Sequence, residues 1–172
     1  SFFAGKISPE ALAAVAKSWP ITFIALAISI GIQAGTQALI SNSIGAKENK
    51  TASLYVAQSI VFAIITSFFV TSFGLNFSDE LLKIMGSTQE SIILTREYLD
   101  IIFYGSIIIL VQLSLNGTLS AQGDTKSYRN ILIFSFFVNI FLNPLFIFGY
   151  GIIPGFGIAG LAISTLIAQS LG

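Results

Sequence analysis

The chain of 172 residues contains no cysteine and no histidine, and only 9% of its residues are charged. The first two absences exclude disulfides, thiol nucleophiles, imidazole bases and the usual zinc sites within this sequence. Eight basic residues balance eight acidic ones, and this zero net charge gives no reason to expect nucleic acid as a partner. We therefore expect no enzyme, no catalytic residues, no metal site and no bound cofactor.

Apolar residues dominate what remains. Hydrophobic residues make up 54% of the chain and the mean hydropathy is +0.86, whereas a soluble domain has about a quarter of its residues charged. Because about 20 helical residues cross the hydrocarbon core of a bilayer, four of the apolar runs are long enough to span it and the fifth is truncated. The sequence predicts an all-α, polytopic transmembrane helix bundle with spans at about 19–44, 52–77, 98–121, 130–149 and 157–172.

Local signals predict how these spans begin and end. Ser8 and Pro9 have the pattern of a helix start, and Trp19-Pro20 is expected to open the first span. The segment 78–97 is expected to form two short interfacial helices that break at Gly86-Ser87, although a plain loop is an equal alternative. The connection from Tyr150 to Gly157 is rich in glycine and is expected to be irregular.

The ends of the chain indicate its extent, and the charges of its loops indicate its orientation in the membrane. The chain starts at Ser1 and stops at Gly172 within an apolar run, which we interpret as an internal fragment of a longer protein. Lysine and arginine are equally numerous on the two sides, but their density in the short loops favours 45–51 and 122–130 as cytoplasmic.

Large polar side chains recur every four residues within three spans, so each set follows one helix face. Carboxamides facing lipid are costly, so these faces should meet protein or water. They are either interhelical hydrogen-bonding groups or the lining of a polar cavity that binds a solute or an ion. The candidate cavity residues are Gln33, Gln37, Gln112, Asn116, Asn139 and Asn143.

Small residues and one proline predict further local features of the spans. Gly31 and Gly35 form a GxxxG element that predicts close backbone contact near Gln33, and Gly160 to Ser164 repeats the spacing. Pro144 frees the carbonyl four residues earlier, beside Asn139 and Asn143, and so marks either a functional hinge or a kink satisfied by a neighbouring helix. No span carries a central Asp or Glu, the usual carriers of protons and sodium.

Three segments together resemble multidrug and toxic compound extrusion (MATE) transporters. They are "ALISNSIGA" at 38–46, "NGTLSAQGDTK" at 116–126 and "NIFLNPLFIFGYGIIPGFGIAGLAIST" at 139–165. The resemblance implies that residues 1–172 form part of the N-terminal six-helix lobe of a twelve-helix, two-lobe transporter. It also implies an integral protein of a bacterial or archaeal plasma membrane, and a cytoplasmic loop in which Asp124 caps a helix.

The sequence departs from the family pattern at one position. Many members carry an Asp directly before the proline of the fifth helix, and here that position is Asn143, whose amide cannot take up a proton. We therefore expect the coupling ion, Na⁺ or H⁺, to use a site outside this fragment or incomplete within it; neutral ligands or the absence of coupling are the alternatives.

The resulting hypothesis is secondary-active multidrug efflux by alternating access. The expected partners are the lipid bilayer, small cationic or amphipathic compounds and the missing remainder of the same chain. A related flippase for lipid-linked oligosaccharide or polysaccharide is one alternative, although no Lys or Arg falls in the middle of a span. A non-transporting membrane scaffold subunit is the other.

Overall fold

The computed structural model describes residues 2–150 and 154–171, and these residues are helical almost throughout. The all-α prediction is therefore confirmed. The seven helices are α1 (Phe2–Ile7), α2 (Pro9–Gly45), α3 (Asn49–Ile84), α4 (Gln89–Tyr104), α5 (Ser106–Ala121), α6 (Thr125–Phe148) and α7 (Gly157–Ser170).

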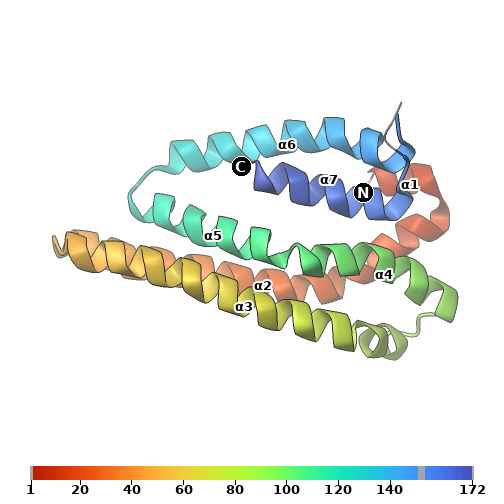
Figure 1. Cartoon of the computed structure of the whole chain (residues 1–172), viewed down its shortest axis with the longest axis horizontal. Coiled ribbons are helices and arrows are strands. Elements are labelled where there is room, and N and C mark those ends of the chain that lie inside the picture. Colours follow the sequence, from red (N-terminus) through yellow and green to blue (C-terminus); the bar gives the residue numbers. More distant parts are fainter. Residues whose placement is uncertain (1, 151–153, 172) are drawn as a thin grey trace.

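The helices pack side by side along a common direction (Figure 1). Helices α2 and α3 form a long antiparallel hairpin that packs on α5, while α6 and α7 pack on each other. Contacts of α4 and α5 with α7 join the two groups. The connections α2–α3 and α5–α6 lie at the same end of the bundle, as expected for loops on one side of a membrane (Figure 1).

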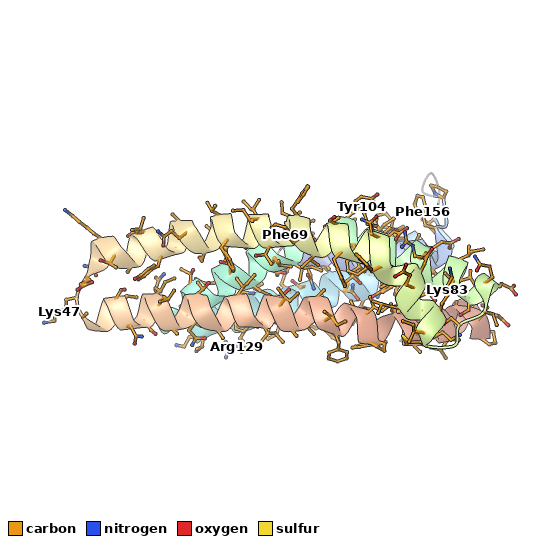
Figure 2. All side chains as sticks on the ribbon, turned by 90° about the horizontal axis from the view of Figure 1, so that it is seen from below. Lys47, Phe69, Lys83, Tyr104, Arg129 and Phe156 are labelled. Carbon is orange, nitrogen blue, oxygen red and sulfur yellow. The ribbon has the colours of Figure 1, made fainter. Side chains whose placement is uncertain are left out.

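The long helices follow the order of the predicted apolar runs. Helices α2, α3 and α6 are each long and apolar enough to cross a membrane, and α4 with α5 reach that length only as a pair, which is bent by 49° at its break. Helix α7 has 14 residues within the described part of the chain. Figure 2 shows the α2–α3 hairpin along its length, with Lys47 at one end and Lys83 near the other.

The start of α2 confirms one local prediction and corrects another. The Ser8 hydroxyl accepts the Ala11 N–H at 3.0 Å and Pro9 follows it, as the sequence predicts. Pro20, however, does not open a helix, because α2 runs through it without interruption. Hydroxyl groups bond to carbonyls of this part of the helix: Ser18 donates to Val15 and Thr22 donates to Ser18.

The segment 78–97 does not form separate interfacial helices, so that prediction is wrong. Helix α3 continues to Ile84 and α4 begins at Gln89. The expected break at Gly86-Ser87 is present, because Gly86 has a φ of 74° and ends the hydrogen bonding of α3. Arg96 holds the two helices together through Asp79 at 3.5 Å and the Leu75 carbonyl at 2.8 Å.

The third predicted span is interrupted at Gly105, which the sequence analysis treated as part of one helix. A Cβ atom there would lie 2.2 Å from the Leu166 side chain of α7, so glycine lets α7 pack closely at this point. The Thr71 hydroxyl of α3 donates to the Phe103 carbonyl at 2.7 Å and lies 2.9 Å from the Ser106 hydroxyl. Hydroxyl groups from a neighbouring helix thus satisfy the backbone at the bend.

The connection before α7 agrees with the predicted irregularity where it is described. Gly149 has a φ of 78° and ends α6, and residues 154–156 have no regular structure. Residues 151–153 lie outside the described part. The Phe156 N–H donates to the Phe146 carbonyl at 2.8 Å, which returns the chain onto α6.

Candidate functional site

Asn139 and Asn143 lie one turn apart on α6 and face α7. The Asn143 amide donates to the Asn139 side-chain oxygen at 2.7 Å, and the Ser164 hydroxyl donates to the Asn143 oxygen. The Asn139 amide in turn lies 3.5 Å from the Thr165 hydroxyl oxygen. Asn143 is only 5% exposed, so this is an internal polar network that joins two helices.

Gln112 and Asn116 lie elsewhere, on α5. They line a hollow of about 530 Å³ that α6 and the end of α7 complete. Asn116 is buried, and Gln112 is half-buried. This pair therefore does line a cavity, but one separate from the network of Asn139 and Asn143.

Gln33 and Gln37 form a third location, on α2. Gln33 is half-buried at the crossing with α5, where a Cβ on Gly117 would lie 2.6 Å from the Gln33 carbonyl oxygen. Gln37 is exposed. The predicted close backbone contact near Gln33 is present, but Gly117 provides it. No described atom lies within 4 Å of a Cβ built on Gly31 or Gly35.

The six candidate amides thus come together pairwise, in three places. Pro144 follows Asn143 directly and lies inside α6, which is continuous from Thr125 to Phe148. Gly160 packs tightly against this part of α6, since a Cβ there would lie 2.2 Å from the Phe146 carbonyl oxygen. The transport role of the amides and the hinge role of Pro144 stay predictions.

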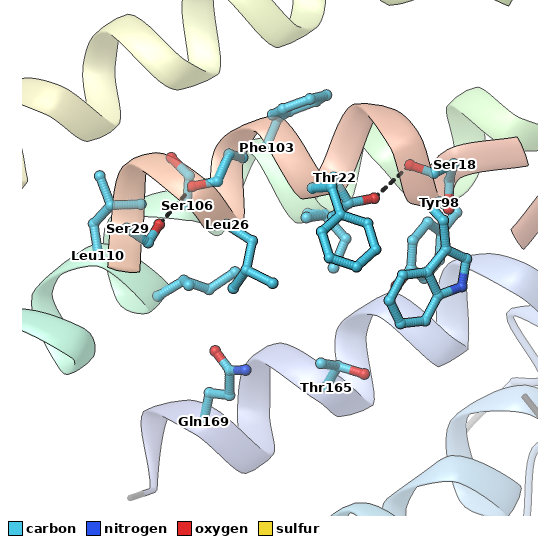
Figure 3. Close-up of a pocket in the computed structure, with 15 residues that line it drawn as sticks. Ser18, Thr22, Leu26, Ser29, Tyr98, Phe103, Ser106, Leu110, Thr165 and Gln169 are labelled. Carbon is cyan, nitrogen blue, oxygen red and sulfur yellow. Dashed lines mark hydrogen bonds between the residues drawn. The ribbon is translucent and has the colours of Figure 1, made fainter. Parts of the chain in front are cut away.

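A further cavity of about 170 Å³ lies between α2, the α4–α5 bend and α7 (Figure 3). We name it the hydroxyl cavity after its polar lining residues, which are Ser18, Thr22, Ser29, Ser106, Thr165 and Gln169. The aromatic residues that line it are Trp19, Phe23, Tyr98 and Phe103. Thr165 connects it to the amide network, because Thr165 also contacts Asn139.

The hydrogen bonds of these hydroxyl groups decide what the cavity offers a solute. Ser29 donates to the Ala25 carbonyl at 2.8 Å, and Thr165 donates to the Leu161 carbonyl at 2.8 Å. A hydroxyl has one proton and two lone pairs, so groups that donate to their own helix keep only acceptor capacity. The Gln169 side-chain oxygen is buried and has no hydrogen-bond partner among the described residues. The cavity is therefore largely apolar, with aromatic faces and a few hydroxyl and amide acceptors, both of which attract cations.

The sequence analysis included Ser29 in a polar stripe but missed most of this cavity. The serine and threonine residues were counted as part of the apolar runs, because a hydroxyl group that bonds to its own helix is tolerated in lipid. A usable signal was present: Ser18, Thr22 and Ser29 recur at steps of four and seven residues on α2.

Asp124 caps α6, as the family resemblance implied. Its carboxylate accepts the Ser127 N–H at 3.0 Å. Hydrogen bonds from Ser127 hold the pKa of the Asp124 carboxyl below its usual value. This residue therefore acts at a helix end in a loop and not in a cavity.

Comparison with known proteins decides the family. The sequence model of the MatE family matches residues 1–145. The chain belongs to the MatE family. Its MATE relatives include the FAD transporter of Shewanella oneidensis, 29% identical over 168 residues, which cover 98% of this chain and 37% of that protein. The probable multidrug resistance protein YoeA of Bacillus subtilis is 30% identical over 159 residues, which cover 92% of this chain and 34% of YoeA.

Solved MATE structures share the fold. A MATE crystal structure in the bent conformation has a TM-score of 0.91 at 29% identity, and the match covers 98% of this chain and 37% of that one. An inward-facing MATE transporter has a TM-score of 0.90 at 29% identity, covering 97% of this chain and 37% of its own. The chain thus spans about a third of the length of these relatives. It is an integral membrane protein with the helix arrangement of a MATE transporter.

Proposed function

We propose that the chain supplies part of the first lobe of a membrane exporter that moves cationic or amphipathic small compounds by alternating access. Na⁺ or H⁺ would be exchanged for the exported compound, and a second lobe would complete the transport path. The hydroxyl cavity, largely apolar with aromatic faces and a few acceptors, supports this proposal most directly within a MATE fold. Solved relatives in outward-facing and inward-facing conformations support alternating access.

The neutral amide at Asn143 affects the coupling step. Asn143 donates to Asn139 and accepts from Ser164, so its groups are already paired and none of the three can release a proton at physiological pH. Coupling would then rely on carboxylates contributed by other parts of the protein. The loops 45–51 and 122–130 would face the cytoplasm.

A flavin dinucleotide is a second candidate cargo, because one relative is named an FAD transporter. Its pyrophosphate is anionic and calls for Lys or Arg in the binding site. The described residues that line the hydroxyl cavity include neither. The cavity therefore favours cationic compounds over FAD.

Efflux of a cationic dye from cells tests the proposal. In the full-length protein, the double substitution Asn139→Leu with Asn143→Leu should reduce efflux at equal expression, because it removes the polar link between α6 and the hydroxyl cavity. Asn76→Leu is the matched control, since Asn76 is an exposed amide on α3 that lines neither site. Unchanged efflux in the double variant would remove Asn139 and Asn143 from the mechanism. Absence of any efflux by the unmodified protein would favour the scaffold alternative.

A further inference from the structure

A second hollow region lies on the opposite side of the bundle from α6, between the two long helices α2 and α3. One part has a volume of about 570 Å³ and is lined by residues from Ile28 to Leu39 on α2 and from Tyr55 to Thr66 on α3. A second part of about 330 Å³ adjoins it at Ile28 and Thr66. We name the first part the α2–α3 groove.

The floor of this groove is open because of its glycines. No described atom lies within 4 Å of the Cβ positions of Gly31 or Gly35, so no part of the described chain fills the space above them. By contrast, a Cβ on Gly117 would meet backbone of another helix. The groove is thus a concave surface whose occupant must come from outside the described residues.

The groove changes in chemistry along its length. Near Thr66 it is lined by apolar side chains, including Ile28, Ile32 and Phe62. At the other end it is lined by Thr36, Tyr55, Gln58 and Ser59. No hydrogen bond joins the Tyr55 hydroxyl or the Gln58 amide to another side chain in the described part of the chain, so both remain able to donate.

The dimensions agree with one leaflet of a bilayer. Tyr55 and Thr66 are eleven residues apart on α3, a rise of about 16 Å. Half of the hydrocarbon core is about 15 Å thick. Because Thr66 lies near the middle of α3, Tyr55 lies at the depth where tyrosine side chains meet the lipid headgroups.

Positive charge lies beyond the polar end of the groove. The turn that joins α2 to α3 carries Lys47 and Lys50, both exposed, with Glu48 between them. The turn therefore has a net positive charge, and lysine side chains at this level reach toward the membrane surface.

From this arrangement we propose that the α2–α3 groove binds an anionic phospholipid from the leaflet on the side of the 45–51 loop. One acyl chain lies along Ile28, Ile32 and Phe62, over the glycine floor. The ester carbonyl oxygens accept hydrogen bonds from Tyr55 and Gln58, and the phosphate is drawn toward Lys47 and Lys50. This site is separate from the hydroxyl cavity and does not depend on which compound the protein transports.

Photochemical labelling of the full-length protein tests the proposal. The protein is placed in phosphatidylcholine vesicles that contain a trace of phosphatidylglycerol with a diazirine in its acyl chain. A second sample contains phosphatidylcholine with the same diazirine chain. After irradiation, mass spectrometry measures the labelling of segments 28–39 and 55–66. We expect the phosphatidylglycerol probe to label both segments several-fold more than the phosphatidylcholine probe.

Two sets of variants separate headgroup from chain recognition. Neutralising Lys47 or Lys50 with glutamine should reduce the phosphatidylglycerol labelling by a factor of about five each, the effect of one basic residue near an anionic surface. Gly35→Leu places a side chain in the groove, where a Cβ meets no described atom, and it should reduce labelling by both probes. Ala34→Leu is the matched control, because Ala34 is exposed on the same helix and does not line the groove.

Three results would overturn the proposal. Equal labelling by the two probes would show ordinary contact with bulk lipid. Undiminished labelling in Gly35→Leu would place the lipid elsewhere. If neither probe labels the groove and position 35 instead cross-links to another protein segment, the groove is a protein contact. Dye efflux is measured in the same preparation, so a failure of lipid binding is distinguishable from a failure of transport.

Discussion

The seam between α6 and α7 and the groove between α2 and α3 are both built on small residues four positions apart. In the first, Gly160 and Ser164 lie directly against α6, where they meet the Phe146 backbone and the Asn143 side chain. In the second, Gly31 and Gly35 face open space. The same sequence spacing thus produces a closed seam in one place and an open groove in the other. The difference lies in how closely a facing helix approaches, because the backbone of α6 meets Gly160 whereas no described helix meets Gly31 or Gly35.

Substituting the glycines tests this contrast and should give the largest effect. Gly160→Ala places a methyl group within 2.2 Å of a backbone oxygen that cannot move independently, so we expect a loss near or above about 3 kcal/mol. Gly31→Ala adds a methyl group to open space and should leave stability equal or slightly increased. Thermal unfolding of the full-length protein in detergent measures both. Similar losses in the two variants would contradict the distinction between seam and groove.

Removing the polar network should have a smaller effect. Asn143→Leu leaves the Ser164 hydroxyl and the Asn139 oxygen without their present partner, and interhelical hydrogen bonds in membranes are each worth about 0.6 kcal/mol, at most about 1.7. We expect a loss of about 1–2 kcal/mol. Gln37→Leu, at an exposed position, should change stability by less than about 0.5 kcal/mol. If both variants unfold at the wild-type temperature, the amides at α6–α7 do not hold that seam.

The helix cap at Asp124 lies outside both regions. Removing its charge should have the smallest effect on stability, and this effect should be seen only at acidic pH. The pKa of Asp124 is lowered in the folded protein, so its stabilising contribution is present above its unfolded pKa of about 3.9 and is lost as the pH falls through the folded value. Asp124→Asn keeps a capping side chain that does not titrate. Between pH 7 and pH 3, the unfolding temperature of the unmodified protein should therefore fall by more than that of Asp124→Asn. An equal fall in unfolding temperature in the two proteins would show that Ser127 does not stabilise the Asp124 carboxylate.

Much of the fold was predictable because long apolar runs leave few alternatives in a membrane. The order of the long helices, the cap at Ser8 and the break at Gly86 follow from local sequence. The continuity of α2 through Pro20 was not predictable in this way. Proline usually interrupts a helix, and here Ser18 and Thr22, on either side of it, donate to the carbonyls of Val15 and Ser18.

The interruption at Gly105 illustrates a second limit. A single glycine in an apolar run is ordinary, and the bend depends on Leu166 and Thr71, which are distant in the sequence. The candidate site shows the same limit. Periodicity placed the amides correctly on helix faces but could not show that α6 and α5 present them to different neighbours.

The hydroxyl cavity is the central claim of this account, and binding of a cationic dye tests it most directly. In the purified full-length protein, Thr22→Val with Thr165→Val keeps the shape of the cavity and removes two acceptors, whereas Thr51→Val removes a hydroxyl outside it. The dissociation constant of ethidium, followed by its fluorescence, should rise about tenfold or more in the double variant, as expected for the loss of two hydrogen-bonding groups of about 1 kcal/mol each, and stay unchanged in Thr51→Val. Equal affinity in all three proteins would show that this cavity does not bind the transported compound.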